Sequence, residues 1–557
     1  MRYGEALADI EEALGQQGFH PYPGEIPTFE GQLRLHGSEV RLRLSFPCLR
    51  FTRYPIARLT HRVDDLPGAV AHIGNDDHLC YAAPGSIVLN LHAPGNNALT
   101  VLGLVENTLQ EIRQGASRDA VVAEFPQHWL AALTVQVALS PQATEGITDF
   151  IGLERLGAPP LLIMCRQNSD GDFDAGAMGT LRRSDVDVVG EAWLGRTDRD
   201  LQLAGRTTPP TNLEEFLTWL QDVDAPLASR VANAVGSNFF GGPARILIQG
   251  PNGCVGGLLD PPKLWQQAAQ TRQGWTRILR QHPARVSLQR WRGAKMDVEY
   301  ARTRNLASGP TLAGRTIALI GCGTIGSHLA RFLVQSGAGA GNGGRLLIVD
   351  TDVLSAGNLG RHWLTAQHIG ASKAKACAKE LKAQFIGVSV HALVDDAMTR
   401  LETLTGYDLV IDATGEEAVS RALNAELVAR RPSAPDSLFV WLVGHGAAAQ
   451  ALFLPGVDDG KGCLACHRPH GTWPSILHED AITDQLPVAC GEAAFTPYGV
   501  AAPVIAAGLA CRMAMEWTRG RVYPSLRSIR VDLASTNEIR DEDVLPRSDC
   551  PACGKEH

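Results

Sequence analysis

Long hydrophobic runs are missing from this sequence of 557 residues. A membrane-spanning helix needs about 18 or more consecutive apolar residues, and no such stretch occurs. We also expect no signal peptide, because the sequence opens with the polar, helix-like segment Met1–Glu5. We therefore expect a cytoplasmic protein that contacts no membrane.

Basic residues are fewer than acidic residues in this sequence. The 51 lysines and arginines are outnumbered by 59 aspartates and glutamates, which gives a formal net charge of −8. Nucleic acids and anionic membranes select for basic surfaces, so this balance argues against both as partners. Internal repeats and low-complexity tracts are absent as well. A content of 45% apolar and 20% charged residues is typical of a globular protein, and the length predicts about three or four domains.

Twelve cysteines are present. In a reducing compartment they serve as metal ligands, nucleophiles or small buried residues more often than as disulfides. Their positions therefore carry more information than their number. We expect five of them to be buried side chains: Cys165, Cys254, Cys322, Cys377 and Cys511.

Residues 1–145 predict a small α+β domain. A helix is expected at Ala6–Leu14. Apolar residues at every second position over 32–35 and 40–46 predict two half-buried antiparallel strands. A loop-rich stretch and a long helix, Ala98–Arg113, follow.

Residues 146–295 predict a connecting α+β domain whose role no motif reveals. Apolar runs at 161–164 and 244–249 indicate strands, and 212–221 indicates a helix. A cluster of glycine and proline at 256–262 predicts a loop.

Residues 296–557 alternate strand and helix signals, which predicts a doubly wound, Rossmann-like sheet. The expected strands include Thr316–Ile320, Leu346–Val349, Leu409–Asp412 and Leu438–Val443. We therefore expect the whole chain to be an α/β and α+β multidomain protein.

The first of these strands runs into a glycine-rich loop. Gly321, Gly323 and Gly326 let a backbone approach phosphates at a helix N-terminus. Asp350, 24 positions beyond Gly326, is placed to bind ribose hydroxyls. A triphosphate about to be cleaved needs added positive charge, whereas a nicotinamide dinucleotide does not. The polar residues that follow therefore favour ATP: Asp352, Asn358, Arg361 and Lys373.

Two Cys-x-x-Cys pairs lie near the end of the sequence, with 84 positions from one to the next. They are Cys463 with Cys466 and Cys550 with Cys553. Four thiolates suit a tetrahedral structural Zn²⁺, which has no open position for catalysis. The metal would clip the end of the chain back onto the domain. The alternative is two unrelated reduced pairs.

Cys490 lies on a loop that enters an expected helix from Ala501 to Trp517. The positive end of a helix lowers the pKa of a nearby thiol, so Cys490 is a candidate nucleophile. A small buried side chain is the alternative.

In the order of these motifs, residues 296–557 resemble the ThiF/MoeB and ubiquitin-activating adenylation family. Asp412-x-Thr414 and the Cys-x-Glu-Ala sequence at Cys490 belong to the same pattern. The resemblance implies that the enzyme uses MgATP to adenylate the C-terminal glycine of a ubiquitin-like protein. It also implies a thioester on Cys490.

By the same resemblance, Asp350 holds the ribose of ATP. An arginine reaches the site across the family's homodimer, and Arg302 or Arg304 stands at the matching place. Three residues bind the phosphates: Asn358, Arg361 and Lys373.

One position departs from the family. A second aspartate that holds Mg²⁺ usually follows the Asp-x-Thr sequence, but this chain has Gly415-Glu416-Glu417. Either Glu416 or Glu417 substitutes for it, or Asp352 or Asp412 carries the ion.

The first domain resembles a ubiquitin-conjugating fold in its divergent prokaryotic form. The matching positions include His72 and Cys80, and Ile73-Gly74 stand where Pro-Asn usually follows the histidine. The asparagine that stabilises the oxyanion is thus missing, and Asn75 or a backbone N–H would replace it. The resemblance makes Cys80 a second nucleophile. His72 either positions or deprotonates the incoming amine, or is structural.

An activating and a conjugating domain on one chain resemble the fusion proteins of bacterial antiphage operons, among them the CD-NTase-associated activating–conjugating proteins of CBASS systems. The resemblance implies a relay in which Cys490 and then Cys80 carry the C-terminus of a protein to a target amine. The carried protein is a nucleotide cyclase in CBASS systems and a ubiquitin-like protein in similar bacterial fusions. Three other functions stay open: a sulfur-carrier adenylyltransferase, a scaffold that binds nucleotide structurally, and a nicotinamide-dependent oxidoreductase.

Overall fold

A computed structural model describes residues 3–554 of the chain, with the exception of 36–37, 62–72, 74–76, 84, 115–121, 123–124, 141–142, 204–205, 207, 269–270, 307–308, 469–475, 480, 482–496 and 521. The expectations for His72, Asn75 and Cys490 therefore lie outside the described residues. The chain divides into two compact units, Met1–Ala175 with Thr180–Met296, and Gly176–Gly179 with Asp297–His557.

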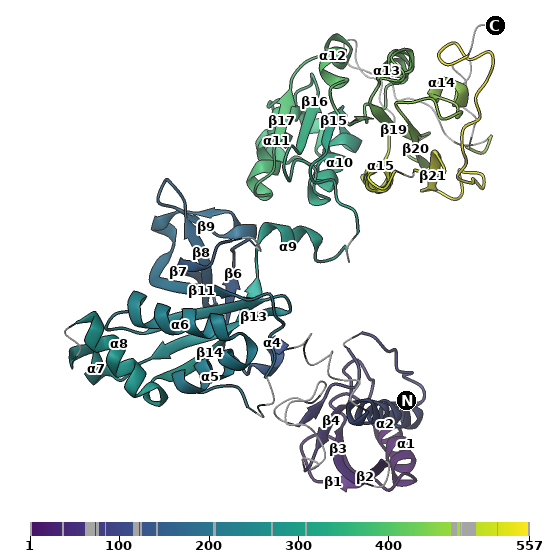
Figure 1. Cartoon of the computed structure of the whole chain (residues 1–557). Helices are drawn as coiled ribbons and strands as arrows, with labels where there is room; N and C mark the ends of the chain where they lie inside the picture. Colours follow the sequence, from purple (N-terminus) through teal and green to yellow (C-terminus); the bar gives the residue numbers. More distant parts are fainter. Residues whose placement is uncertain are drawn as a thin grey trace. The chain divides into compact units, whose positions relative to one another are not determined.

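The N-terminal part of the first unit is a five-stranded antiparallel sheet in the order β1-β2-β3-β4-β5, against which two helices pack (Figure 1). Val40, Leu42 and Leu44 are buried, whereas the arginines between them are not, so the predicted alternation is confirmed. The strands are β1 (His20–Tyr22), β2 (Thr28–Leu35), β3 (Ser38–Ser45), β4 (Ile56–Leu59) and β5 (His78–Leu79). The helices are α1 (Tyr3–Gly15) and α2 (Pro94–Arg113).

A sheet of nine strands forms the rest of the first unit, in the order β10-β9-β8-β6-β14-β13-β12-β11-β7. An additional pairing of β7 with β8 closes seven of these strands into a ring. The strands are β6 (Leu133–Val137), β7 (Gly146–Arg155), β8 (Ala158–Gln167), β9 (Phe173–Asp174), β10 (Thr180–Leu181), β11 (Asp187–Arg196), β12 (Ala244–Gly250), β13 (Gly253–Asp260) and β14 (Ser287–Lys295).

Helices pack against this sheet over an aromatic core. The ring centroids of Trp129 and Trp219 lie 4.6 Å apart in that core. The helices are α4 (Phe125–His128), α5 (Leu213–Val223), α6 (Ala225–Asn238), α7 (Lys263–Ala268) and α8 (Arg272–Gln281).

The loop predicted at 256–262 is wrong, because most of that segment belongs to strand β13, in the interior of the sheet. Neighbouring backbones leave no space for side chains there. A Cβ on Gly256 would lie 2.1 Å from the carbonyl oxygen of Ile246, and one on Gly257 would lie 2.2 Å from that of Gln289. Because glycine is far more frequent in loops than in strands, the sequence pattern predicts a loop here, although these glycines serve close packing between strands.

The second unit contains a seven-stranded sheet in the order β17-β16-β15-β18-β19-β20-β21. The strands from β17 to β19 are parallel, and β20 and β21 add two antiparallel strands at one edge. They are β15 (Thr316–Ile320), β16 (Arg345–Val349), β17 (Val390–Leu393), β18 (Leu409–Asp412), β19 (Asp436–Val443), β20 (Ala448–Leu454) and β21 (Leu526–Arg530).

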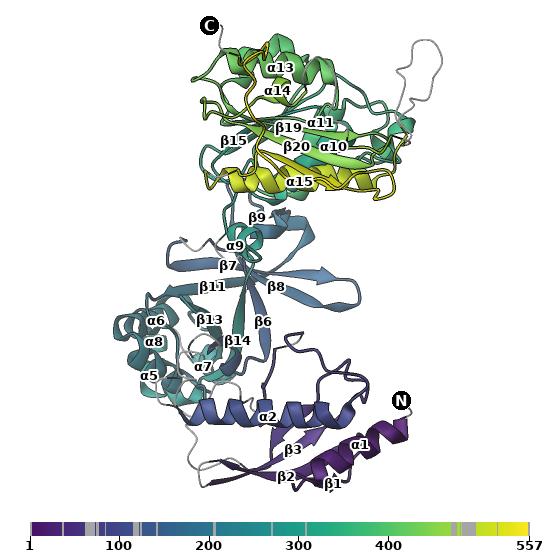
Figure 2. The same ribbon diagram turned by 90° about the vertical axis from the view of Figure 1, so that its right-hand side faces the viewer.

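Helices cover both faces of this sheet, which confirms the predicted doubly wound arrangement (Figure 2). One face packs against α10 (Thr324–Gln335), α11 (Lys373–Gln384) and α15 (Ala501–Trp517). The other packs against α12 (Leu401–Leu404), α13 (Glu417–Ala429) and α14 (Leu464–His467). A further helix, α9 (Val298–Thr303), precedes the sheet.

Within the described part of the chain, none of the helices combines the length and the apolar content that a bilayer-spanning segment needs. The prediction of buried cysteines is confirmed for all five positions: Cys165, Cys254, Cys322, Cys377 and Cys511.

Candidate nucleotide and thiol sites

The glycine-rich loop joins β15 to α10 at the carboxyl edge of the parallel strands. Gly321 has φ +85°, and a Cβ on it would lie 2.8 Å from the backbone nitrogen of Thr414. A Cβ on Gly326 would lie 1.8 Å from the carbonyl oxygen of Gly321. At Gly323 no described atom lies within 4 Å of the place where a Cβ would stand. The loop is therefore tightly packed at its ends and open at its middle glycine, beside the N-terminus of α10.

Asp350 follows β16 and ties this strand to the glycine loop. Its Oδ2 accepts a hydrogen bond from Cys322 N at 2.6 Å, and its Oδ1 accepts one from Asp352 N at 2.7 Å. Lys373, the first residue of α11, is buried, and its Nζ lies 2.7 Å from Asp352 Oδ2. One cation and two carboxylates thus converge beside the loop.

A cavity of about 320 Å³ lies at this edge of the sheet, where doubly wound folds bind their ligands. Ile320, Val349, Ala397 and Val419 give it an apolar part that suits a flat base. Five residues predicted from the sequence line it: Gly321, Gly323, Asp350, Asp352 and Lys373.

Two predicted phosphate ligands lie outside this lining. Asn358 Oδ1 accepts hydrogen bonds from the nitrogen and hydroxyl of Ser355, at 2.9 and 3.0 Å, and so closes a short turn after β16. The guanidinium carbon of Arg361 lies 4.4 Å from the ring centroid of Tyr498. Sequence reasoning missed Tyr498, because no motif marks a residue 137 positions away from Arg361.

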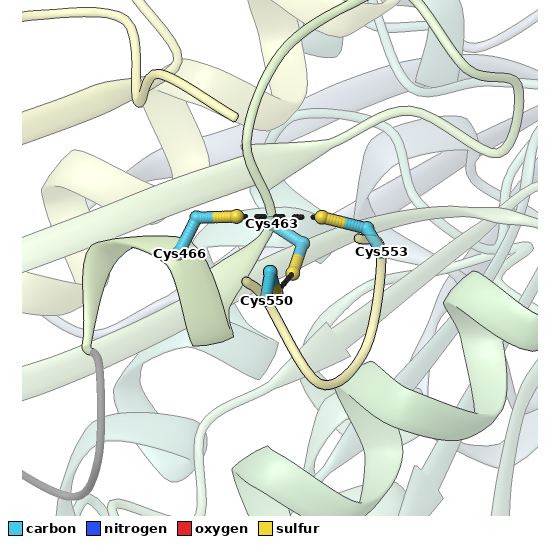
Figure 3. Close-up of side chains that lie close together, drawn as sticks. All are labelled: Cys463, Cys466, Cys550 and Cys553. Atoms are coloured by element: carbon cyan, nitrogen blue, oxygen red, sulfur yellow. Dashed lines mark hydrogen bonds between the residues drawn. The ribbon is translucent and has the colours of Figure 1, made fainter. Parts of the chain in front are cut away.

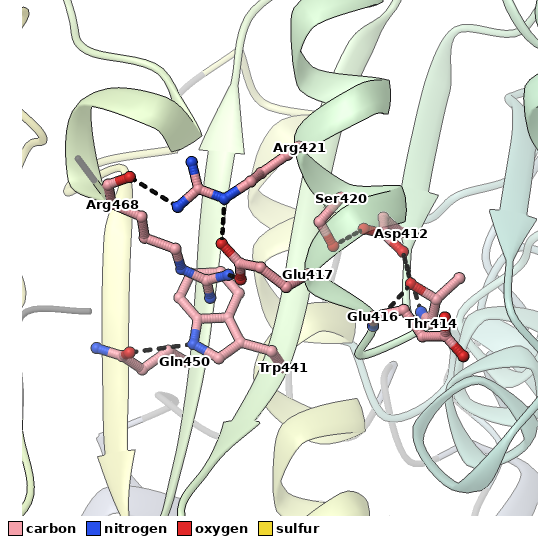
Figure 4. A network of polar contacts seen from close by, with 9 residues as sticks. All are labelled: Asp412, Thr414, Glu416, Glu417, Ser420, Arg421, Trp441, Gln450 and Arg468. Carbon is pink, nitrogen blue, oxygen red and sulfur yellow. Dashed lines mark hydrogen bonds and ion pairs between the residues drawn. The ribbon is translucent and has the colours of Figure 1, made fainter. Parts of the chain in front are cut away.

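Asp412, at the end of β18, is buried and does not line the cavity. Its Oδ1 accepts hydrogen bonds from the nitrogen and hydroxyl of Thr414 at 3.0 and 2.7 Å, and its Oδ2 accepts one from the Ser420 hydroxyl (Figure 4). Burial raises the pKa of this carboxyl above its usual value, although the hydrogen bonds oppose the shift. Asp412 therefore fixes the loop that carries Thr414.

The two glutamates that follow have different surroundings. Glu417 accepts hydrogen bonds from Arg421 and from Arg468, whose buried guanidinium lies 3.9 Å from the ring centroid of Trp441 (Figure 4). Glu416 lies beside Thr414, apart from these arginines, and lines the 320 Å³ cavity. Glu416 is thus the glutamate that faces the candidate nucleotide site.

The two arginines predicted to reach the site from a dimer partner have other contacts within this chain. Arg302 donates to the carbonyl of Ile386 at 2.6 Å and lines a different cavity, of about 710 Å³. Arg304 donates to the hydroxyl of Tyr300 at 3.1 Å. Neither arginine lines the 320 Å³ cavity of this chain.

The four cysteines of the two Cys-x-x-Cys pairs come together (Figure 3). All four sulfurs lie within 4.8 Å of one another, with 3.7 Å from Cys463 to Cys550 and 3.3 Å from Cys466 to Cys553. A tetrahedral ion with bonds of about 2.3 Å places its sulfur ligands slightly less than 4 Å apart. Asn424 donates to Cys463 Sγ at 3.5 Å and accepts from Leu464 N at 3.0 Å, which orients this ligand. The donor set is compatible with Zn²⁺.

Cys80 directly follows the edge strand β5, and its side chain is exposed. Two tyrosines fix the loops around it. Tyr81 donates to the carbonyl of Pro55 at 2.6 Å, and Tyr54 donates to that of Ile87 at 2.7 Å. The first unit therefore presents Cys80 to solvent on a braced loop.

Cys48, which sequence reasoning did not single out, is a half-buried thiol in the loop between β3 and β4. It lines a cavity of about 510 Å³. A hydrogen bond from the Thr52 hydroxyl, with Oγ1 3.2 Å from Sγ, and one from the backbone N–H of Arg50 lower the pKa of this thiol to about 7.

We expect alkylation of Cys48 by iodoacetamide to reach half of its maximal rate near pH 7, because the thiolate is the reacting form. An ordinary thiol reaches that point near pH 8.5. Peptide mass spectrometry after brief labelling between about pH 5 and pH 9 measures the profile. Thr52→Val, which removes the hydroxyl, shifts the midpoint upward. A wild-type midpoint above about pH 8 would contradict the assignment.

Comparison with known proteins agrees with this geometry. The ThiF family model matches residues 309–550. Over 572 aligned residues, the chain is 30% identical to the ATP-dependent ubiquitin transferase-like protein Cap2 of Pseudomonas aeruginosa (strain BWHPSA011 / Pa011), which covers 99% of this chain and 100% of that protein. The chain belongs to the Cap2 family.

Two further relatives match shorter stretches. Cap2 of Vibrio cholerae serotype O1 (strain ATCC 39315 / El Tor Inaba N16961) is 34% identical over 229 residues, 39% of this chain and 37% of that protein. The adenylyltransferase and sulfurtransferase MOCS3 of Mus musculus is 33% identical over 177 residues, 30% of this chain and 34% of that protein.

Membership of the Cap2 family confirms the resemblance to activating–conjugating fusion proteins, and the ThiF match confirms the adenylation fold. The chain is an enzyme of the adenylyltransferase and transferase type.

Proposed function

We propose that this enzyme activates the C-terminal glycine of a protein with ATP, carries it as a thioester on Cys490 and then on Cys80, and joins it to a target amine. The donor is a nucleotide cyclase, and the reaction serves bacterial antiphage defence. The support is the Cap2 relationship over the whole chain and the nucleotide cavity lined by residues predicted from the sequence.

The proposed chemistry runs in four displacements. A carboxylate oxygen of the donor attacks the α-phosphorus of ATP, and pyrophosphate leaves. The Cys490 thiolate attacks the carbonyl carbon of the acyl-adenylate, and AMP leaves. The Cys80 thiolate then takes the acyl group from Cys490. An amine attacks the second thioester, an amide forms, and the Cys80 thiol is released. The two thioesters keep the acyl group activated between its reaction with ATP and amide formation.

The residues of the nucleotide cavity have separate parts in the first displacement. The open glycine loop and the N-terminus of α10 bind the phosphates, Asp350 binds the ribose, and the ammonium of Lys373 stabilises the charge on the departing pyrophosphate. Arg302 or Arg304 of a second copy completes the site in a homodimer. ATP and reduced thiols are both available in the bacterial cytoplasm, so we place the reaction there.

The observation that carries the proposal is the exposed, braced Cys80 in a chain that also holds the nucleotide cavity. A sulfur-carrier adenylyltransferase is the second candidate, because MOCS3 is a relative. A sulfur-carrier adenylyltransferase does not need Cys80, and MOCS3 aligns with only 30% of this chain. A ubiquitin-like protein in place of the nucleotide cyclase would leave the relay unchanged.

ATP–pyrophosphate exchange tests the first step. We would purify the proteins encoded beside this gene that end in glycine, a nucleotide cyclase among them, and measure exchange with each. We expect exchange with one donor and none with the same donor lacking its final glycine. The proposal would be contradicted by equal exchange with and without the donor's final glycine, or by the absence of exchange with every such donor.

We further propose that Glu416 and Asp352 hold the Mg²⁺ that accompanies ATP. Both carboxylates line the cavity, although Asp352 is also paired with Lys373, whereas neither Glu417 nor Asp412 lines it. Oxygen donors beside substrate phosphates are the usual ligands of this ion. The ion would neutralise charge on the phosphates during displacement.

Glu416→Gln should therefore weaken binding of Mn²⁺, a paramagnetic substitute for Mg²⁺, by about tenfold or more in the presence of a non-hydrolysable ATP analogue. Electron paramagnetic resonance of free Mn²⁺ measures the affinity without turnover. Glu417→Gln is the matched control, expected to leave Mn²⁺ affinity unchanged. If both variants lose Mn²⁺ affinity equally, Glu416 is not a specific ligand of the ion.

We also propose that the four-cysteine cluster holds a structural Zn²⁺. Clipping residues 550–553 onto α14 contributes folding free energy, since metal binding and folding are coupled. Purified protein should contain about one zinc per chain by mass spectrometry of the elements. Cys553→Ser should lower zinc content and the melting temperature, whereas Cys511→Ser, at a cysteine outside the cluster, should keep the zinc. Full zinc content in Cys553→Ser would refute the site.

A further inference from the structure

The ring of Tyr498 lies against the guanidinium of Arg361, with 4.4 Å from Arg361 Cζ to the ring centroid. Its hydroxyl lies 3.1 Å from the Thr324 hydroxyl. Thr324 is the first residue of α10, directly after the glycine loop. A single side chain thus contacts both a predicted phosphate ligand and the helix end at which phosphates are expected.

The backbone at Arg361 is held on its other side. The carbonyl of Arg361 accepts a hydrogen bond from His328 Nε2 on α10 at 3.1 Å. His362 Nε2 lies 2.8 Å from the carbonyl of Cys322 in the glycine loop, and burial lowers the pKa of this histidine to about 4, so it donates as a neutral ring. The two histidines thus hold the main chain at Arg361 and in the glycine loop, and the ring of Tyr498 contacts the guanidinium of Arg361 itself.

The position of Tyr498 is itself restricted. Gly446, in the turn between β19 and β20, has φ +74°, and a Cβ there would lie 2.9 Å from the Cβ of Tyr498 and 2.8 Å from that of Ala502. The tyrosine is therefore packed closely against the main chain of Gly446, three residues before α15 begins. Its ring is half-buried, so it offers a fixed face to a cation.

We infer that Tyr498 is a positioning residue that holds the guanidinium of Arg361 for the phosphates of ATP. Arginine is charged at every working pH, and its planar group stacks on aromatic faces. A long side chain without such a support loses rotamer freedom when it binds a ligand, and that loss weakens binding. The ring of Tyr498 restricts Arg361 before the nucleotide arrives. This inference rests on the proposed function, because it takes Arg361 as a phosphate ligand.

A double-mutant cycle on ATP affinity tests the inference. Isothermal titration with ATP and Mg²⁺, without any donor protein, gives the dissociation constant of wild type, Tyr498→Leu, Arg361→Ala and the double variant. We expect Tyr498→Leu to raise the constant by about 3- to 30-fold, the range that a cation–π contact supports. In the Arg361→Ala background the same change should alter it by less than about twofold.

Two further variants separate positioning from simple support of the fold. Tyr498→Phe keeps the ring and loses the contact with Thr324, and we expect it to restore most of the affinity. Tyr22→Leu is the matched control, because Arg43 stacks on Tyr22 at 3.7 Å in the N-terminal sheet, and it should leave ATP affinity unchanged. If Tyr498→Leu does not fold, Tyr498→Met, with an apolar side chain of similar length, takes its place in the cycle.

The outcomes distinguish this inference from the proposed function. No ATP binding by the wild type would overturn the proposed function itself. ATP binding by the wild type with equal losses from Tyr498→Leu in both backgrounds would overturn the positioning role and leave the function standing. If Tyr498→Phe binds ATP as weakly as Tyr498→Leu does, the aromatic ring does not position Arg361, and the inference is likewise overturned.

Discussion

Lys373→Ala lowers ATP–pyrophosphate exchange by about 10²- to 10³-fold, the usual cost of removing one group that stabilises developing charge. The Nζ of Lys373 is the only lysine nitrogen among the lining residues of the nucleotide cavity that the structure describes. Its side chain is buried, so water does not replace the lost charge fully. The rate of exchange with the active donor, measured over a range of ATP concentrations, gives both kcat and KM.

The fold should survive this change. The partner carboxylate of Asp352 is 65% exposed, so breaking the pair leaves no buried charge. Lys375, an exposed lysine two positions further along the same helix, gives the matched control Lys375→Ala, which should keep full exchange. If Lys373→Ala retained more than about a tenth of the wild-type rate with an unchanged melting temperature, Lys373 would not serve the phosphates.

Cys80→Ala abolishes conjugate formation, by at least about 10³-fold, and leaves exchange unchanged. The reason is that the thiolate of Cys80 is the last carrier in the relay, whereas activation takes place before Cys80 is needed. Conjugates are counted on denaturing gels with ATP, the donor and the target protein. Exchange is measured on the same preparations.

Cys48→Ala is the control for this experiment. Cys48 lies in the loop between β3 and β4 of the same N-terminal part, and hydrogen bonds lower its pKa to about 7, so a relay that used any available thiolate there would depend on it. We expect normal conjugation in Cys48→Ala. The sulfur-carrier alternative gains support if Cys80→Ala conjugates as the wild type does, and the assignment of the carrier moves to Cys48 if only Cys48→Ala fails.

The parallel strands were the most predictable part of the fold. Thr316–Ile320 and Leu409–Asp412 form strands with the predicted bounds. Strands buried on both faces appear in a sequence as short continuous apolar runs, and these runs end in glycine or aspartate at the binding edge. The cysteine cluster was equally legible, since few structures other than a metal site need two Cys-x-x-Cys pairs.

The nine-stranded sheet was not predictable in the same way. Its strand β13 contains Gly256 and Gly257, which close packing of neighbouring backbones requires. Single-sequence patterns read such glycines as loops. Only the contacts with Ile246 and Gln289, from two other strands, show why a side chain would not fit at these positions.

Side-chain orientation at the site also lay beyond the sequence. Glu416 and Glu417 are adjacent and chemically equal, yet one faces the cavity and the other pairs with Arg421 and Arg468. That difference comes from the geometry at the start of α13. Tyr498 meets Arg361 across 137 positions by packing alone, which no local pattern records.

Mass spectrometry of the thioesters tests the relay most directly. Wild-type protein is incubated with ATP and the active donor, digested under mild acid, and searched for donor C-terminal peptides joined to cysteine. The relay predicts adducts on Cys490 and on Cys80 that need ATP and disappear with dithiothreitol, and an adduct on Cys490 alone in Cys80→Ala. Conjugation that proceeds with no ATP-dependent adduct on either cysteine would contradict the account.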